Sequence, residues 1–341
     1  MPTVSKCSNT VVIASYILSG LGLLLILQQG LLAALFSGLL VYSLVHLMAP
    51  TLGGQISNQR QRMIAVALLS TLIVTALSGG IWAIINYFQT LQSDPEQVAR
   101  LLQKLSDIIE GSRAQLPDWL RSHLPVGVDA LREMMMRWMR EHAVEARSVG
   151  QVAGRVIAHI LIGMVIGAMA ALYDTTEPKN YKPLAAALHG RVVSLAKAFE
   201  QIVFAQVRIA AINALFTGLF LFVALPLGGV HLPLSKTMVA ITFVAGLLPV
   251  IGNLISNTVL VVVGLSHSLH VAVASLLFLI TIHKLEYFLN AKIIGSHINA
   301  RAWELLAAML MMEAVFGVPG VIAAPVLYAY LKKELSDNGL V

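Results

Sequence analysis

Two stretches, LLPVIGN at 247–253 and FGVPGVIAAP at 316–325, decide the fold predicted for this chain. Each lies within a long apolar segment, the first at 238–265 and the second at 305–331. Proline removes a backbone hydrogen-bond donor and glycine weakens a helix interior, so both segments are predicted to break. Broken backbone survives at membrane depth only where protein or a water-filled cavity shelters it. Paired breaks are typical of transport sites, which favours a solute carrier.

The composition is that of a membrane protein. Of 341 residues 57% are hydrophobic and only 12% are charged, against about 25% charged in soluble domains. We therefore predict an all-α polytopic membrane protein. The net charge of +6 comes without clustered basic and aromatic residues, so no nucleic-acid partner is expected. A single cysteine, Cys7, excludes an intrachain disulfide, and the histidines are too scattered for a metal site. We expect no cofactor and no enzymatic activity.

Apolar runs long enough to cross a bilayer predict about six to eight membrane segments, counting the two interrupted ones. The first run is interpreted as a retained span and not as a cleaved signal. Gly163 and Gly167 fit the small-xxx-small pattern that lets two helices approach closely. The predicted regions are membrane spans at 1–88, an extracytoplasmic amphipathic helical insert at 89–150, a span at 151–172, a cytoplasmic basic loop with an amphipathic helix at 173–208, and a membrane core at 209–341.

Basic residues near span ends predict the orientation, because they favour the cytoplasm. Lys6, Arg60, Arg62 and the loop at 179–208 fall on one side, which places the N-terminus in the cytoplasm and the amphipathic insert outside. The last third admits two foldings, kinked full spans or re-entrant hairpins with tips at Pro249–Gly252 and Pro319–Gly320. Re-entrant hairpins return the basic loop after the first break to the cytoplasm and are favoured, and both foldings leave the C-terminus cytoplasmic.

One polar face is predicted on the helix at 268–290. His283, Glu286 and Asn290 recur at helical spacing, while Lys284 points elsewhere. An ionisable side chain at mid-membrane costs roughly 3 kcal/mol, so it usually marks a pathway or has a partner. Glu286 is therefore either a carrier of protons or cations, or a structural group neutralised by a nearby base.

Two further carboxylates accompany the second interrupted segment, one at its start and one deeper within it. Glu304 and Glu313 are nine residues apart and would face opposite sides of a straight helix. Glu304 has Arg301 close by, whereas Glu313 has no basic neighbour in sequence and is the stronger candidate for coupling to an ion. After the first break, Asn253 and Asn257 lie one turn apart, and they either bind a polar solute or bond between helices.

Three features in order resemble the autoinducer-2 exporter family: Pro-x-x-Gly at 249–252, the polar stretch at 284–290 leading to Lys292 and Gly295, and Phe-Gly-x-x-Gly with Ala-Pro at 316–325. The resemblance implies a multi-pass exporter or permease of the bacterial inner membrane. It also implies a homo-oligomer, a pentamer in the family, and export of the signalling furanone autoinducer-2, with sodium/proton exchange in some members. Glu313 stands where the family has small glycines, which favours an ion-coupled member.

We therefore predict a secondary transporter that exports a small polar solute, coupled to H⁺ or Na⁺, with a binding site at the two breaks. A cation/proton antiporter and a non-transporting membrane scaffold are the alternatives. Besides solute and ions, membrane lipid is the expected contact. The predicted pathway residues are Pro249, Gly252, Asn253, Asn257, His283, Lys284, Glu286, Asn290, Glu304, Glu313, Gly317, Pro319, Gly320 and Pro325.

Overall fold

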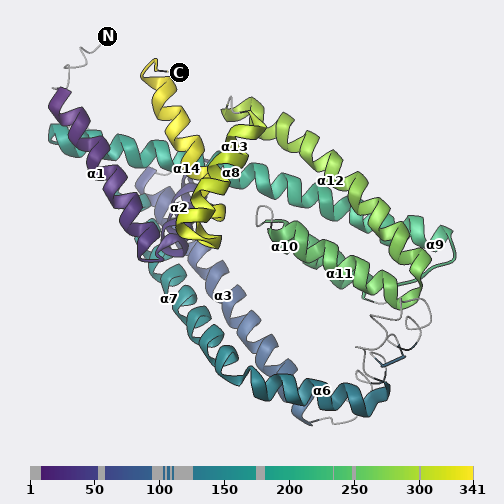
Figure 1. Cartoon of the computed structure of the whole chain (residues 1–341). Helices are drawn as coiled ribbons and strands as arrows, with labels where there is room; N and C mark the ends of the chain where they lie inside the picture. Colours follow the sequence, from purple (N-terminus) through teal and green to yellow (C-terminus); the bar gives the residue numbers. More distant parts are fainter. Residues whose placement is uncertain are drawn as a thin grey trace. The chain divides into compact units, whose positions relative to one another are not determined.

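A computed structural model of the chain describes residues 9–52, 58–93, 103, 106–107, 110, 126–173, 181–232, 234–247, 251–298 and 301–340. Every regular element among these residues is helical (Figure 1), which confirms the all-α prediction. The helices are α1 (Asn9–Gln28), α2 (Leu32–Met48), a 3₁₀ turn (Ala49–Leu52), α3 (Asn58–Ser93), α6 (Gly127–Glu141), α7 (Ala143–Tyr173), α8 (Pro183–Leu219), a π-helical segment (Phe220–Ala224), α9 (Leu225–Leu227), α10 (Ser235–Gly246), α11 (Ile251–His267), α12 (Leu269–Ile298), α13 (Ala302–Phe316) and α14 (Val318–Asp337).

Three helical stretches are long and apolar enough to cross a membrane: Thr10–Gln28, Gly150–Tyr173 and Pro183–Leu227. Shorter apolar helices accompany them, among them Leu32–Met48 and Ser235–Gly246. This pattern confirms a polytopic membrane protein.

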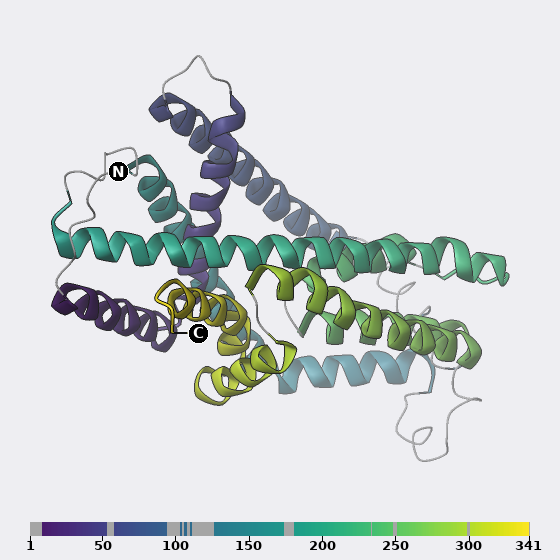
Figure 2. The same ribbon diagram turned by 90° about the horizontal axis from the view of Figure 1, so that it is seen from above.

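The predicted basic loop and the span after it are joined in the structure. Residues 183–208 form the first part of α8, which runs on without a break into the start of the predicted membrane core at 209 (Figure 2). The predicted boundary at residue 208 is therefore not a helix end. Within the insert predicted at 89–150, the end of α3, α6 and the start of α7 are described, and residues 94–102, 104–105, 108–109 and 111–125 lie outside the described residues.

The chain divides into two compact units. Unit 1 comprises residues 1–73, 153–205 and 291–341, and unit 2 comprises residues 74–152 and 206–290. The core of unit 1 joins α2, α8 and α14 through buried Leu39, Phe199 and Val326. Phe199 meets Phe36 of α2 edge to face, with ring centroids 5.2 Å apart, an arrangement favoured by aromatic quadrupoles. The core of unit 2 is built by the π-helical segment and α9 with α10, α11 and α12.

The small residues of α7 place its backbone directly against α2, as their spacing predicted. A Cβ on Gly163 would lie 2.1 Å from the Ala34 carbonyl oxygen, and one on Gly167 would lie 2.1 Å from the Gly38 oxygen. Ser37 adds a hydrogen bond, its hydroxyl donating to the Ile160 carbonyl at 3.0 Å. Glycine is required here because the neighbouring atoms belong to backbone, which no side-chain rotation can move away.

Replacing Gly167 with alanine should separate these two helices. The new methyl group would overlap the Gly38 backbone, and overpacking of this kind costs about 1–3 kcal/mol. We expect a lower midpoint of thermal unfolding for the purified Gly167→Ala protein in detergent. Gly154→Ala on the same helix is the control, because nothing lies within 4 Å of its added Cβ. Equal midpoints for the two variants would contradict the close contact.

Candidate functional site

The first interrupted segment folds into a helical hairpin within unit 2. Helix α10 ends at Gly246 and α11 begins at Ile251, and the two helices pack side by side (Figure 1). A Cβ on Gly252 would lie 1.8 Å from the Ala245 carbonyl oxygen, so only glycine fits in the first turn of α11. Gln206 of α8 donates from its amide to the Gly246 carbonyl at 2.7 Å, satisfying an acceptor at the end of α10. Pro249 lies outside the described residues.

The second interrupted segment forms a hairpin of the same kind within unit 1. Helix α13 ends at Phe316, and the chain reverses at Gly317, whose φ of 62° and ψ of −147° favour glycine. The Gly317 amide closes the last turn by donating to the Glu313 carbonyl at 2.7 Å. A Cβ on Gly320 would lie 2.0 Å from the Met312 carbonyl oxygen. Both hairpins therefore use a glycine in the first turn of the second arm to let it touch the backbone of the first.

Two details of the predicted second break are wrong. Pro319 and Gly320 were expected at the hairpin tip, but they belong to the first turn of α14, where proline needs no amide donor. Pro325 was expected to interrupt the helix, but α14 continues through it. Ala323, Ala324 and Val326 are buried around Pro325, so packing holds the helix together where one backbone hydrogen bond is missing. The reversal is confined to Gly317.

Glu304 is held by the second arm of its own hairpin. The Tyr328 hydroxyl donates to Glu304 Oε2 at 2.5 Å and Lys332 Nζ donates to the same oxygen at 2.6 Å. The sequence suggested Arg301 as the partner, and the structure supplies Lys332. Glu304 lies just before the predicted membrane segment at 305–331. The hydrogen bond from Lys332, followed by the one from Tyr328, lowers the pKa of Glu304 from 4.5 to about 2. It stays ionised at neutral pH, which favours a structural role over proton carriage.

The lowered pKa of Glu304 predicts an acid-sensitive hairpin. Because the folded state favours the carboxylate, its stabilisation is complete above the ordinary pKa of 4.5 and is lost as the pH falls towards 2. The midpoint of thermal unfolding should fall over this window, and less steeply in Glu304→Gln. Glu133→Gln is the control, because its ion pair with Arg137 is exposed. If the unfolding midpoint of Glu304→Gln fell with pH as steeply as that of the wild type, the acid sensitivity would belong to another group.

Glu313 lies on the other side of α13, as the nine-residue spacing predicted. Its side chain is exposed, whereas Glu304 faces α14. Leu306 and Leu310, seven and three residues earlier, share its helix face and are 52% and 69% exposed, so the carboxylate stands on an apolar face. The role of Glu313 in ion coupling stays a prediction.

The remaining predicted residues are only partly described. Asn257 is half-buried on α11 and Lys284 is exposed on α12. The side chains of Asn253, His283, Glu286 and Asn290 lie outside the described residues, so the polar face of α12 stays a prediction. Among the described residues, no group of three or more His, Cys, Asp or Glu side chains is placed to hold a metal ion.

A buried ion pair in unit 1 was missed by the sequence reasoning. Glu334 of α14, only 5% exposed, pairs through Oε2 with Arg191 of α8. The Tyr16 hydroxyl of α1 donates to the same oxygen at 3.2 Å, and the guanidinium carbon lies 3.8 Å from the Tyr16 ring centroid. Asn338 donates to the Tyr16 hydroxyl at 2.8 Å. The cluster joins three helices that are distant in sequence, so no spacing of residues within one helix predicts it.

Removing Glu334 should destabilise unit 1 strongly. In Glu334→Ala the mostly buried Arg191 loses its counter-ion, which costs about 3–5 kcal/mol in comparable sites. The matched control is Asp337→Ala on the same helix, because the exposed Asp337–Lys333 pair is worth only about 0.5 kcal/mol. The midpoint of thermal unfolding in detergent measures the loss of stability in each of the two variants. Similar small losses in the two variants would show that Arg191 does not depend on Glu334.

The helices, the two hairpins and the apolar composition together define a polytopic membrane protein. The family model described as "AI-2E family transporter" matches residues 13–337, nearly the whole chain. The chain belongs to this family, which confirms the resemblance found in its motifs. No curated protein matches the chain in a sequence search.

Proposed function

We propose that this protein is a secondary transporter that exports a small polar solute such as an autoinducer-2-like furanone, coupled to H⁺ or Na⁺. The observation that carries the proposal is the pair of helical hairpins, each closed by a glycine against a backbone carbonyl. Discontinuous helices of this kind accompany transport sites because their ends present backbone groups to a ligand. Family membership supports a transporter. Location in the bacterial inner membrane, cytoplasmic termini and homo-oligomeric assembly belong to the same proposal.

The hairpins suit a polar, oxygen-rich ligand. A helix N-terminus carries partial positive charge and free amide donors, and α11 and α14 each begin at a break. Helix α10 has 12 residues and measures about 18 Å, which is short of the roughly 30 Å hydrocarbon core. Its length therefore supports a re-entrant arm whose end reaches the interior of the membrane.

Glu313 is the proposed ion-responsive group. In Glu313→Gln the side chain keeps its size but cannot gain or lose a proton. We expect uptake of furanone into liposomes holding the reconstituted protein to lose its dependence on an imposed pH or Na⁺ gradient, with a tenfold or greater loss of the stimulated rate. Glu141→Gln, an exposed carboxylate on α6, is the control. An unchanged gradient dependence would reject the role of Glu313.

The same liposomes test the hairpin itself. Gly320→Ala would force α14 away from the Met312 carbonyl, whereas Gly190→Ala has open space around the new methyl group. Loss of furanone flux in the first variant alone ties transport to the hairpin.

A cation/proton antiporter is the second candidate, and the exposed Glu313 on an apolar face favours it. Exchange of Na⁺ for H⁺ in the liposomes, without any furanone movement, would select it. A non-transporting scaffold would show neither flux, and family membership weighs against it.

A further inference from the structure

Two adjoining cavities in unit 2 lie between the same pair of helical elements. The first, here called the polar pocket, has a volume of about 580 Å³ and is lined by the end of the α8–α9 helix, the connection after it and the first turn of α10. The second, here called the apolar groove, has a volume of about 490 Å³ and runs between the preceding turns of α8 and the next turns of α10. Phe222 lines both, so the two cavities follow one another along the same helices.

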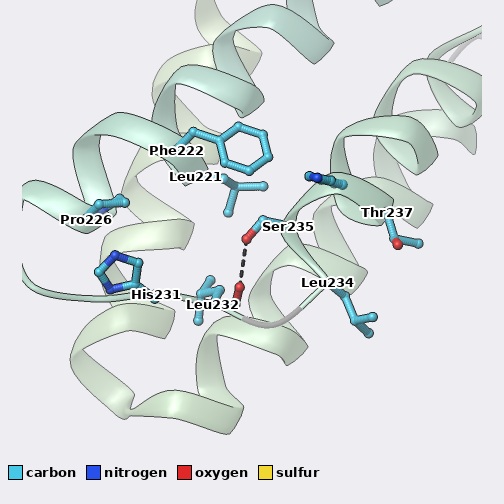
Figure 3. Close-up of a pocket in the computed structure, with 9 residues that line it drawn as sticks. Leu221, Phe222, Pro226, His231, Leu232, Leu234, Ser235 and Thr237 are labelled. Carbon is cyan, nitrogen blue, oxygen red and sulfur yellow. Dashed lines mark hydrogen bonds between the residues drawn. The ribbon is translucent and has the colours of Figure 1, made fainter.

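The polar pocket is equipped for an anion. Its lining residues include Lys236, His231, Ser235 and Thr237, and no acidic side chain is among those described (Figure 3). The Ser235 hydroxyl donates to the Leu232 carbonyl at 2.8 Å, which fixes the turn that precedes α10. Leu234 at the N-cap has no side-chain oxygen to accept from the first amides of the helix. Lys236 and the uncapped helix start together make this end of the cavity positive.

No polar side chain is among the described residues that line the apolar groove. Its walls are aliphatic and aromatic, among them Leu215, Val239 and Phe243. Gly218 adds no side chain to the groove. A Cβ at this position would be in van der Waals contact with Val239 at 3.8 Å and Phe222 at 4.0 Å. A methylene chain is the ligand chemistry that gains most from such walls, at about 0.8 kcal/mol for each buried CH₂.

The π-helical segment explains how Phe222 comes to lie at the junction. Pro226 has no amide hydrogen, and the helix adapts by a wider turn in which the Leu225 amide donates to the Phe220 carbonyl. Leu221 then stays buried at 2% exposure, while Phe222 and Val223 are about half exposed. Phe222 therefore lines both the polar pocket and the apolar groove.

The order of the two cavities matches the depth profile of a phospholipid. The helix Pro183–Leu227 is one of the three long and apolar enough to cross a membrane. With residues 209–227, the start of the predicted membrane core, as the crossing part, its last turns would lie within hydrocarbon and its end near the headgroups. The apolar groove lies along those last turns, and the polar pocket lies at the helix end. We propose that this groove and pocket bind one anionic phospholipid, with an acyl chain along α8 and α10 and the phosphate at Lys236 and His231.

The test is native mass spectrometry of the full-length protein purified in detergent, with added phosphatidylglycerol or phosphatidylcholine. We expect wild type to retain phosphatidylglycerol at least threefold more than phosphatidylcholine. The double variant Lys236→Gln/His231→Gln should lose this preference. Ala211→Phe, which places a ring into the apolar groove from an exposed position, should lower retention of both lipids. Lys197→Gln removes one exposed positive charge elsewhere on α8 and should change nothing.

Three results would overturn the proposal. Equal retention of the two lipids by wild type would show that headgroup charge is not recognised. Equal losses in Lys197→Gln and in the double variant would assign the preference to overall charge. Binding of inorganic phosphate that depends on Lys236 and His231, with lipid retention unaffected by Ala211→Phe, would show a site for a free anion. Because no arm measures transport, the outcome is independent of the proposed solute flux.

Discussion

Close approach between helix backbones, allowed only where a Cβ is missing, is the constraint on which the described structure depends. It operates three times: where α7 crosses α2 at Gly163 and Gly167, where α11 turns back at Gly252, and where α14 turns back at Gly320. In each case the atom that a methyl group would strike is a backbone carbonyl oxygen. Inside a membrane, where apolar side chains gain little by leaving lipid, such close backbone packing supplies much of the attraction between helices.

The charged groups divide into two kinds on the basis of their surroundings. Glu304 and Glu334 each accept a hydrogen bond from a tyrosine and pair with a basic side chain, so they join helices. Glu313 is exposed on an apolar face. The contrast distinguishes two carboxylates that lie nine residues apart on one helix, and it supports Glu313 in the proposed ion coupling.

Several local features were predictable because their causes lie in adjacent residues. Glycine and proline act on the backbone within one turn, so the breaks after Gly246 and at Gly317 and the all-α character follow from composition and pattern. The small-xxx-small spacing of Gly163 and Gly167 likewise predicted a close helix contact. Pro325 shows the limit of such reasoning, because burial against other helices maintains α14 through a residue that usually ends a helix.

The sequence by itself determined which segments are helical and apolar, which two segments are interrupted, and which family the chain resembles, since all of these depend on short-range order. Only the tertiary structure decided which residues meet. Lys332 reaches Glu304 because the chain reverses at Gly317, and Arg191 reaches Glu334 because α8 packs beside α14. The cavity around Phe222 likewise needs α8 and α10 together. Contacts between distant residues depend on how helices pack, and helical periodicity within one segment carries no information about its neighbour.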